Sequence, residues 1–295
     1  MKAAIFMLLT SGLLVAPQPA DQSSFKVNVA LVVLNATVHD RQGHVIADLR
    51  QQDFEVYEDG VRQSLRLFRH DDAPVAVGLV IDHSSSMRLK LQDVVTAARL
   101  FIQSSSSEDQ MFVVNFNEKV TRSLPAFSNR VDELARAISN KPAAGMTALY
   151  DAILEARQHL EAATSAKKVL LVVSDGGDNA SKHNLHDVVS RLADQSNTLL
   201  YAIGIFDADD EDRNPTVLKR LAEATGGEAF FPHQTADIKG TCEHVAKEIR
   251  QQYTLGYVSS NPARPGKHHV IRVVAHAQGK KIAVRTRSGY TNGVE

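Results

Sequence analysis

The sequence predicts an α/β fold: a doubly wound, mostly parallel sheet covered by helices, with a β-rich module built from the N- and C-terminal flanks. Two patterns predict this class. Between residues 74 and 250, apolar strand-like runs alternate with amphipathic helical stretches. On either side of this region, short runs of alternating apolar and polar residues are typical of half-buried strands.

Composition and charge narrow the class of protein. The chain has 295 residues, of which 43% are hydrophobic and 23% charged, with only 9 prolines. These values are those of an ordinary globular protein. The formal net charge of -1 gives no field that would attract nucleic acid or anionic lipid. We therefore expect no nucleic-acid partner.

Residues 1–20 have the pattern of an export signal peptide. Lys2 gives a positive start, Ala3–Ala16 is an apolar run, and Pro17–Ala20 is a small-residue exit. The run is short for a membrane span, and the alternative is a buried N-terminal strand or helix. We expect an exported protein, periplasmic or extracellular. No cysteine follows the run directly, so a new N-terminus there has no acceptor for a lipid anchor.

The N-terminal segment, residues 25–72, reads as β-rich. Apolar residues alternate from Val27 to Val33, and Asp40–Gly43 is a turn signal. Farther on, Phe54–Tyr57 is followed by Glu58-Asp59-Gly60 and then by Leu65–Phe68. Asp-Gly between two alternating runs predicts a hairpin between them.

The central region, residues 74–250, predicts the α/β domain. Its strand candidates are Val75–Ile81, Met111–Phe116, Val169–Val173, Leu199–Ile205 and Glu228–Phe231. Its helical stretches are 87–104, 130–139, 148–162, 185–194, 215–225 and 236–251. Parallel strands need long crossover connections, so this alternation favours a parallel sheet with helices on both faces.

The C-terminal segment, residues 253–290, returns to strands. The candidates are Tyr253–Tyr257, His269–Ala275 and Ile282–Thr286. Each flank alone has too few strands for a stable sheet with a buried face. We therefore predict that 253–290 pairs with 25–72 in one module, with the α/β domain inserted between them. The rival arrangement is two separate appendages.

A set of oxygen-bearing residues follows the first strand of the central region. Asp82, Ser84 and Ser86 lie between this strand and the first helix, at the edge where open α/β sheets bind ligands. Residues two apart can project to one side of a loop, and carboxylate and hydroxyl oxygens are hard ligands that suit magnesium. The alternative is that Ser86 simply caps the helix.

Two further signals favour metal binding. Gly145-Met146-Thr147 precedes another helix, and Ser174-Asp175-Gly176 ends the strand at 169–173. Both lie at the ends of strands or helices on the expected binding edge. Hydroxyl and carboxylate oxygens from three segments would then meet at one place.

These positions resemble the von Willebrand factor A (VWA) domain family, which has a Rossmann-like fold and a metal-ion-dependent adhesion site (MIDAS). The match covers roughly residues 74–250. Together with the flanking Phe54–Gly60 and the terminal Arg287–Tyr290, it is similar to bacterial VWA-related proteins, which resemble one another over nearly their full length. The resemblance implies that Ser84, Ser86 and Thr147 ligate the ion through hydroxyls, while Asp82 and Asp175 hold it mainly through water. One departure is Ala143-Ala144-Gly145-Met146, where the family usually has Gly-Gly before the threonine.

The resemblance also implies a function. We expect Mg²⁺, or Mn²⁺ or Ca²⁺, with one exchangeable position that a carboxylate of a protein partner fills. The protein would then act in adhesion or assembly, without catalysis and without a small-molecule substrate. The alternative is a structural scaffold that holds the metal only for stability.

Other readings of the sequence are less favoured. Asp82, His83 and Ser84 contain the residue types of a hydrolase triad, but neighbours in sequence seldom face one another, and no Gly-x-Ser-x-Gly elbow is present. No glycine-rich phosphate loop with lysine follows a strand. The pair His268-His269, with His276, could form a second metal site, but histidines of a solvated strand are the favoured interpretation.

Overall fold

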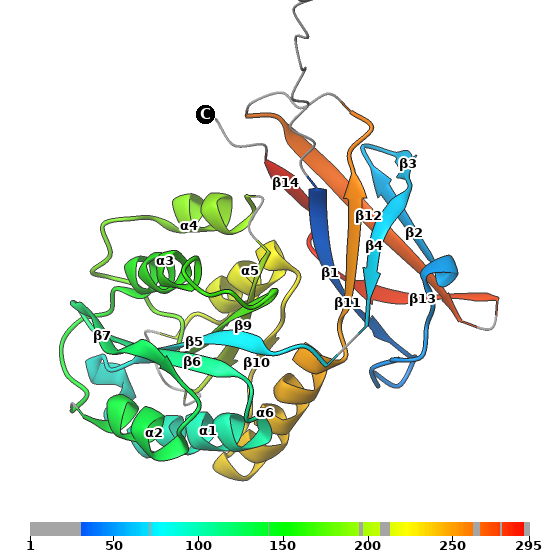
Figure 1. Ribbon diagram of the computed structural model, residues 1–295. Coiled ribbons are helices and arrows are strands. Elements are labelled where there is room, and N and C mark those ends of the chain that lie inside the picture. Colours follow the sequence, from blue (N-terminus) through cyan, green and yellow to red (C-terminus); the bar gives the residue numbers. More distant parts are fainter. Residues whose placement is uncertain are drawn as a thin grey trace, which may run out of the picture.

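The computed structural model describes residues 31–70, 72–140, 142–194, 197–206, 213–261, 266–277 and 279–291. The export signal expected at residues 1–20 lies outside this part of the chain. Within it, no helix combines the length and the apolar character that crossing a membrane requires. The described chain contains two β-sheets, one of them flanked by helices (Figure 1).

The central sheet has six strands in the order β10-β9-β8-β5-β6-β7. Their bounds are β5 Val75–Asp82, β6 Gln110–Phe116, β7 Val120–Ser128, β8 Lys167–Ser174, β9 Thr198–Gly204 and β10 Ala229–Phe230. Only β7 is antiparallel to its neighbour. Every residue of β5 is buried, because helices cover both faces of the sheet. The predicted doubly wound, mostly parallel sheet is thus confirmed.

Six α-helices cover the two faces of the central sheet (Figure 1). They are α1 Leu91–Ser104, α2 Val131–Ser139, α3 Leu149–Leu160, α4 Leu185–Leu192, α5 Pro215–Thr225 and α6 Thr235–Arg250. Residues of α1, α2 and α6 share one core cluster with the sheet, and residues of α3, α4 and α5 share the other. Alternate residues of β5 belong to the two cores, as Leu79 and Val80 show.

The order of the strands places a binding edge beside β5. From β5 the chain continues to β6 on one side, and β8 pairs with the other side of β5. The loops that leave β5 and β8 therefore diverge at a topological switch point. Open α/β sheets bind ligands at such points, outside the carboxyl ends of the strands. We call this place the metal edge; it consists of residues 82–87, 145–147 and 174–177.

The second sheet, here called the flank sheet, contains strands from both ends of the chain. The order is β3-β2-β12-β13-β1-β11-β4, with β14 also paired to β12. The bounds are β1 Leu31–His39, β2 Phe54–Glu58, β3 Val61–Gln63, β4 Leu65–Arg69, β11 Tyr253–Val258, β12 His268–Ala277, β13 Lys280–Arg285 and β14 Gly289–Thr291. β1 pairs with β11 and β13, and β2 pairs with β12. Strands before and after the central sheet thus share one hydrophobic core.

The predicted hairpin between Phe54–Tyr57 and Leu65–Phe68 is wrong. Asp59 and Gly60 have φ angles of 50° and 82°, which are those of a two-residue hairpin turn. This turn pairs Glu58 with Val61, so β3 becomes the partner of β2. Residues 65–69 form β4 and pair with β11 instead.

A buried ionic group lies at the junction between the two sheets. Glu248 of α6 pairs with Arg285 of β13, which also pairs with Glu228. The Tyr201 hydroxyl of β9 donates to Glu248 Oε1 at 2.5 Å, and Gln252 Nε2 donates to the same hydroxyl at 2.8 Å. Since Arg285 belongs to the flank sheet and Tyr201 to the central sheet, Glu248 connects the two.

Two histidines complete the surroundings of this carboxylate. His39 Nε2 and His244 Nε2 both lie 3.6 Å from Glu248 Oε2. Burial acts to raise the pKa of Glu248, but the nearby His244 and His39 rings and the charge of Arg285 outweigh it and hold this pKa far below its usual value of 4.5. The nearby Glu248 carboxylate raises the pKa of His244 above its usual 6.5, against the effect of burial.

Glu248→Gln is expected to lower the free energy of unfolding by about 3 kcal/mol, because it leaves the Arg285 guanidinium, which is only 24% exposed, without its main counter-charge. A carboxylate with a lowered pKa stabilises the fold above its ordinary pKa of 4.5. A histidine with a raised pKa stabilises it below 6.5. The loss of stability in Glu248→Gln should therefore be largest between pH 4.5 and pH 6.5 and should shrink as the pH falls below 4.5.

Urea unfolding over a pH series measures this loss. The matched control is Glu243→Gln in the same helix, where the carboxylate is 55% exposed and pairs only with Lys239. A loss in Glu248→Gln no larger than in the control would contradict a stabilising role for the junction.

Candidate metal centre

Asp82 ends strand β5 and is completely buried. Its Oδ1 accepts a hydrogen bond from Ser84 N at 2.8 Å, and its Oδ2 accepts one from Ser174 Oγ at 2.6 Å. The first bond comes from the loop that follows β5, and the second from the end of β8. Asp82 is therefore held in one orientation by both walls of the metal edge.

Three more of the predicted ligands lie in direct contact. Ser86 Oγ donates to Asp175 Oδ2 at 2.5 Å, and Ser84 Oγ lies 3.0 Å from Ser86 Oγ. Asp175 Oδ1 accepts from Gly177 N at 3.0 Å, which fixes the other side of this carboxylate. With Asp82, four of the five predicted positions thus form one connected group of oxygen donors.

The capping interpretation of Ser86 is wrong. Helix α1 begins at Leu91, and Lys90 occupies its N-cap position. Ser86 instead lies in a short 3₁₀ turn, Ser85–Met87, that precedes the helix. Its hydroxyl is directed to Asp175, across the metal edge, rather than to the backbone of α1.

Thr147 reaches the metal edge through its backbone. Ser85 N donates to Gly145 O at 3.0 Å, which ties the loop of Thr147 to the serine loop. Thr147 O accepts hydrogen bonds from Asn179 N and Ala180 N, both at 2.9 Å. In the part of the chain that the structure describes, no hydrogen bond joins the Thr147 hydroxyl to the other four side chains. The loop that carries Thr147 is thus tied to the serine loop through Gly145 and to residues 179–180 through the Thr147 carbonyl.

Gly145 explains why this loop can depart from the usual family sequence. Its φ angle is +87°, which strains any residue with a Cβ. A Cβ at this position would lie 1.7 Å from Glu118 Oε2. The glycine therefore serves both the turn and the close approach of the Glu118 carboxylate.

The electrostatics of the group suit a cation. Burial, together with the nearby charge of Asp175, raises the pKa of Asp82 to about 7 despite the hydrogen bonds from Ser174 and Ser84. Two carboxylates held this close repel each other, and a cation between them would remove that cost. The available donors are carboxylate and hydroxyl oxygens, the ligands of Mg²⁺ and Ca²⁺. The residues present therefore fit a hard divalent cation.

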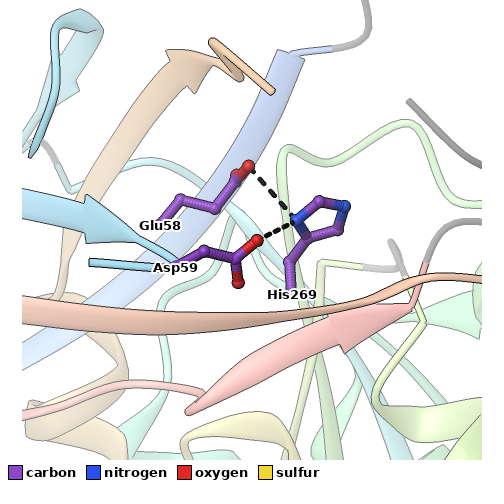
Figure 2. A group of neighbouring side chains, drawn as sticks. All are labelled: Glu58, Asp59 and His269. Carbon is purple, nitrogen blue, oxygen red and sulfur yellow. Dashed lines mark hydrogen bonds and ion pairs between the residues drawn. The ribbon is translucent and has the colours of Figure 1, made fainter. Parts of the chain in front are cut away.

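A second polar group lies in the flank sheet, far along the chain from the first. Glu58 and Asp59 come from the β2–β3 hairpin, and His269 comes from β12 (Figure 2). One ligand atom from each residue lies within 4.8 Å of the others, so the group could hold a metal ion. His269 is only 1% exposed, so the expected placement of His269 in a solvated strand is wrong.

Glu58 is a buried carboxylate with several donors. Oε2 accepts from Tyr257 Oη at 2.6 Å and from Tyr290 Oη at 3.0 Å. Oε1 accepts from Ser259 Oγ at 2.5 Å and from Asn261 Nδ2 at 3.0 Å. Burial acts to raise the pKa of Glu58, but these hydrogen bonds outweigh it and lower the pKa. Two sequence signals point here: the Glu58-Asp59-Gly60 turn and the histidine pair His268-His269.

Comparison with known proteins identifies the family. The family model for the von Willebrand factor type A domain matches residues 77–248, more than half of the chain. The protein therefore belongs to the VWA domain family. The matched residues begin in β5 and end in α6, so they coincide with the central sheet and its helices.

The similar proteins share the fold at low identity. A von Willebrand factor type A protein from Catenulispora acidiphila is 14% identical to this chain. The match covers 91% of this chain and 75% of that protein, with a TM-score of 0.52. An aerotolerance-related membrane protein from Bacteroides fragilis is 16% identical, covers 60% of this chain and 99% of its own, and has a TM-score of 0.50. The PilB minor pilin of Streptococcus sanguinis, as a D319A mutant, is 12% identical to this chain. The match covers 62% of this chain and 63% of the pilin, with a TM-score of 0.50.

Among curated proteins, the inter-alpha-trypsin inhibitor heavy chain H2 of Mesocricetus auratus is 28% identical over 172 residues. The matched stretch is 53% of this chain and 18% of that protein. This chain therefore spans less than a fifth of the length of that curated relative.

Gly145→Ala is expected to lower the free energy of unfolding by about 1 kcal/mol or more, because alanine is strained at a positive φ. Gly43→Ala is a matched control, since Gly43 has a φ of +84° and nothing within 4 Å of a new Cβ. Denaturant unfolding of both variants, and of Gly145→Ala combined with Glu118→Ala, separates backbone strain from the contact with Glu118. Equal losses of unfolding free energy in the three variants would show that the contact with Glu118 adds nothing to the cost of the substitution.

Proposed function

We propose that this protein binds a divalent cation, Mg²⁺ or alternatively Mn²⁺ or Ca²⁺, through Asp82, Ser84, Ser86, Thr147 and Asp175. Through that cation it binds an acidic group of a protein partner. The observation that carries the proposal is the connected group of carboxylate and hydroxyl oxygens at the carboxyl ends of β5 and β8.

The chemistry of these residues supports binding. Two carboxylates neutralise a divalent ion, and the serine and threonine hydroxyls add neutral oxygens. The ion then remains electrophilic and supplies a position that a Glu or Asp side chain of the partner fills. Such an interaction depends on the metal, because the partner's carboxylate would otherwise meet two like charges.

The same residues argue against catalysis. The oxygens of Asp82 accept from Ser84 N and Ser174 Oγ, so this carboxylate is engaged with a backbone amide and a different serine. His83 lines a separate small pocket together with Asn115 and Lys119. A triad of Asp82, His83 and Ser84 would require Asp82 and Ser84 to exchange their present hydrogen-bond partners. The competing function is a scaffold whose metal serves stability alone.

The proposed setting is outside the cytoplasm. Residues 1–20 have the pattern of an export signal. Two of the proteins with similar folds are described as a membrane protein and a minor pilin. We infer an exported protein that acts in adhesion or in the assembly of a surface structure.

We further propose a division into domains. Residues 74–250 form the VWA domain, and residues 25–72 and 253–290 form one β-rich module around it. The antiparallel pairing of β1 with β11, and of β2 with β12, supports this division. The module would hold the metal edge in a fixed orientation relative to the exported N-terminus.

The first test is metal binding. Calorimetric titration with MgCl₂ and MnCl₂ should show one saturable site in the wild type, and Asp82→Ala should weaken it at least tenfold because a charged ligand is lost. Thr147→Ala should weaken it less, since it removes a neutral ligand. Asp132→Ala is the control, with a carboxylate that is 80% exposed and pairs with Arg99. Equal affinity in wild type and Asp82→Ala would disprove the assignment.

The second test concerns the partner. Crosslinking pulldown from the native cell envelope in magnesium, repeated with chelator, should recover a protein only when metal is present. Replacing the contacting Asp or Glu of that protein by Ala should then abolish its binding. A partner retained at full affinity in chelator would favour a metal-independent surface, and stabilisation by metal without any such partner would favour the scaffold.

A further inference from the structure

The geometry points to a second metal site in the flank sheet, formed by Glu58, Asp59 and His269 and suited to a transition-metal cation such as Zn²⁺. This site differs in kind from the metal edge. It offers a histidine nitrogen with two carboxylate oxygens, a set that favours Zn²⁺ over Mg²⁺. It does not depend on the proposed adhesion site.

The two separations that involve His269 Nδ1 agree with tetrahedral coordination, and the ligand atoms of all three residues lie within 4.8 Å of one another. His269 Nδ1 lies 3.0 Å from Asp59 Oδ2 and 3.4 Å from Glu58 Oε1 (Figure 2). Ligands about 2.0 Å from a tetrahedral Zn²⁺ are separated from one another by about 3.3 Å. Both side-chain separations therefore need to change by only a few tenths of an ångström. Asp59 is 27% exposed, which gives the ion a path and leaves room for water as a fourth ligand.

The ligands are also held in place before any ion arrives. The His269 ring stacks on Tyr290, with ring centroids 5.1 Å apart and planes 20° apart. Tyr257 and Tyr290 donate to Glu58 Oε2, which directs Oε1 towards the histidine. Asp59 Oδ1 accepts from Val270 N at 2.9 Å, which leaves Oδ2 on the side of His269. Metal ligands are typically oriented by such outer hydrogen bonds.

Two existing interactions compete with an ion. Glu58 Oε1 accepts from Ser259 and Asn261, and one of these bonds would have to lengthen. Lys267 Nζ lies 3.2 Å from Asp59 Oδ2, but this side chain is 43% exposed and can move into water. The metal-free alternative is that His269 itself donates a hydrogen bond to the two carboxylates. The two cases differ in whether a cation competes with a proton for His269 Nδ1.

The position of the site gives it a structural role. Glu58 and Asp59 precede the VWA domain in sequence, and His269 follows it. A metal bound to all three would join the two chain flanks across the β2–β12 pair, where Glu58 lies opposite Ile271. Because the ligands converge only in the folded state, binding would stabilise that state by mass action.

The test uses the full chain carrying Asp82→Ala, so that the proposed magnesium site is removed from every protein compared. Zn²⁺ binding is measured by titration and by the shift in the unfolding temperature. Co²⁺ is a second probe, because its visible absorption reports tetrahedral coordination. In this background, His269→Gln is compared with His268→Gln, an exposed neighbour in β12 whose Nδ1 lies 3.2 Å from Thr291 Oγ1.

One saturable Zn²⁺ site with a raised unfolding temperature is expected, at least tenfold weaker in His269→Gln and unchanged in His268→Gln. Asp59→Asn should also weaken binding at least tenfold while keeping the fold, since asparagine tolerates the positive φ of this turn. If His269→Gln does not fold, Asp59→Asn alone tests whether this site binds Zn²⁺. The proposal is overturned if the Asp82→Ala protein binds no stoichiometric Zn²⁺. It is also overturned if His268→Gln weakens Zn²⁺ binding while Asp59→Asn leaves it unchanged, because surface histidines would then hold the ion.

Discussion

The arrangement of the metal edge depends on the register between β5 and β8. These parallel strands pair from Val75 with Lys167 to Ile81 with Val173, through runs that are buried on both faces. This register brings the next residues, Asp82 and Ser174, within 2.6 Å of each other at their side chains. A shift by one residue would turn alternate side chains to the wrong core and would separate Asp82 from Asp175. Apolar packing therefore positions a site that is itself entirely polar.

The flank sheet is coupled to this arrangement through α6. The helix packs on the central sheet with Cys242 and Val245, while its Glu248 pairs with Arg285 of the flank sheet. Glu248 is fully buried, so the ion pair is not screened by water in the way a surface pair is. Any rotation of the flank sheet against α6 would leave one of these charges without its partner, which is costly. The ion pair therefore opposes rotation of the flank sheet against α6.

Much of the fold and of the metal edge was predictable from sequence, and the failures have physical causes. Runs such as Val75–Ile81 are buried on both faces, and this gives them an unmistakable apolar pattern. β7 was missed because its residues are only partly buried and include Pro125. Asp82, Ser84 and Ser86 lie at the end of β5 and Asp175 follows β8, so the order of the strands along the chain located them. Thr147 was predicted from its place before a helix. His269 and Glu58 are 211 positions apart, and no local pattern relates them; only the pairing of β2 with β12 does.

Asp82 at the metal edge and Glu58 in the flank sheet have pKa values that are shifted in opposite directions. This difference defines what a metal would do at each site. Burial and a like charge raise the pKa of Asp82, so its anionic form is costly until a cation is present. Glu58 is equally buried, but four hydroxyl and amide donors lower its pKa and satisfy the anion without any metal. A cation at the metal edge would therefore remove repulsion that the protein cannot relieve itself. A cation in the flank sheet would act instead by joining segments from the two ends of the chain, and the sheet does not need it to fold.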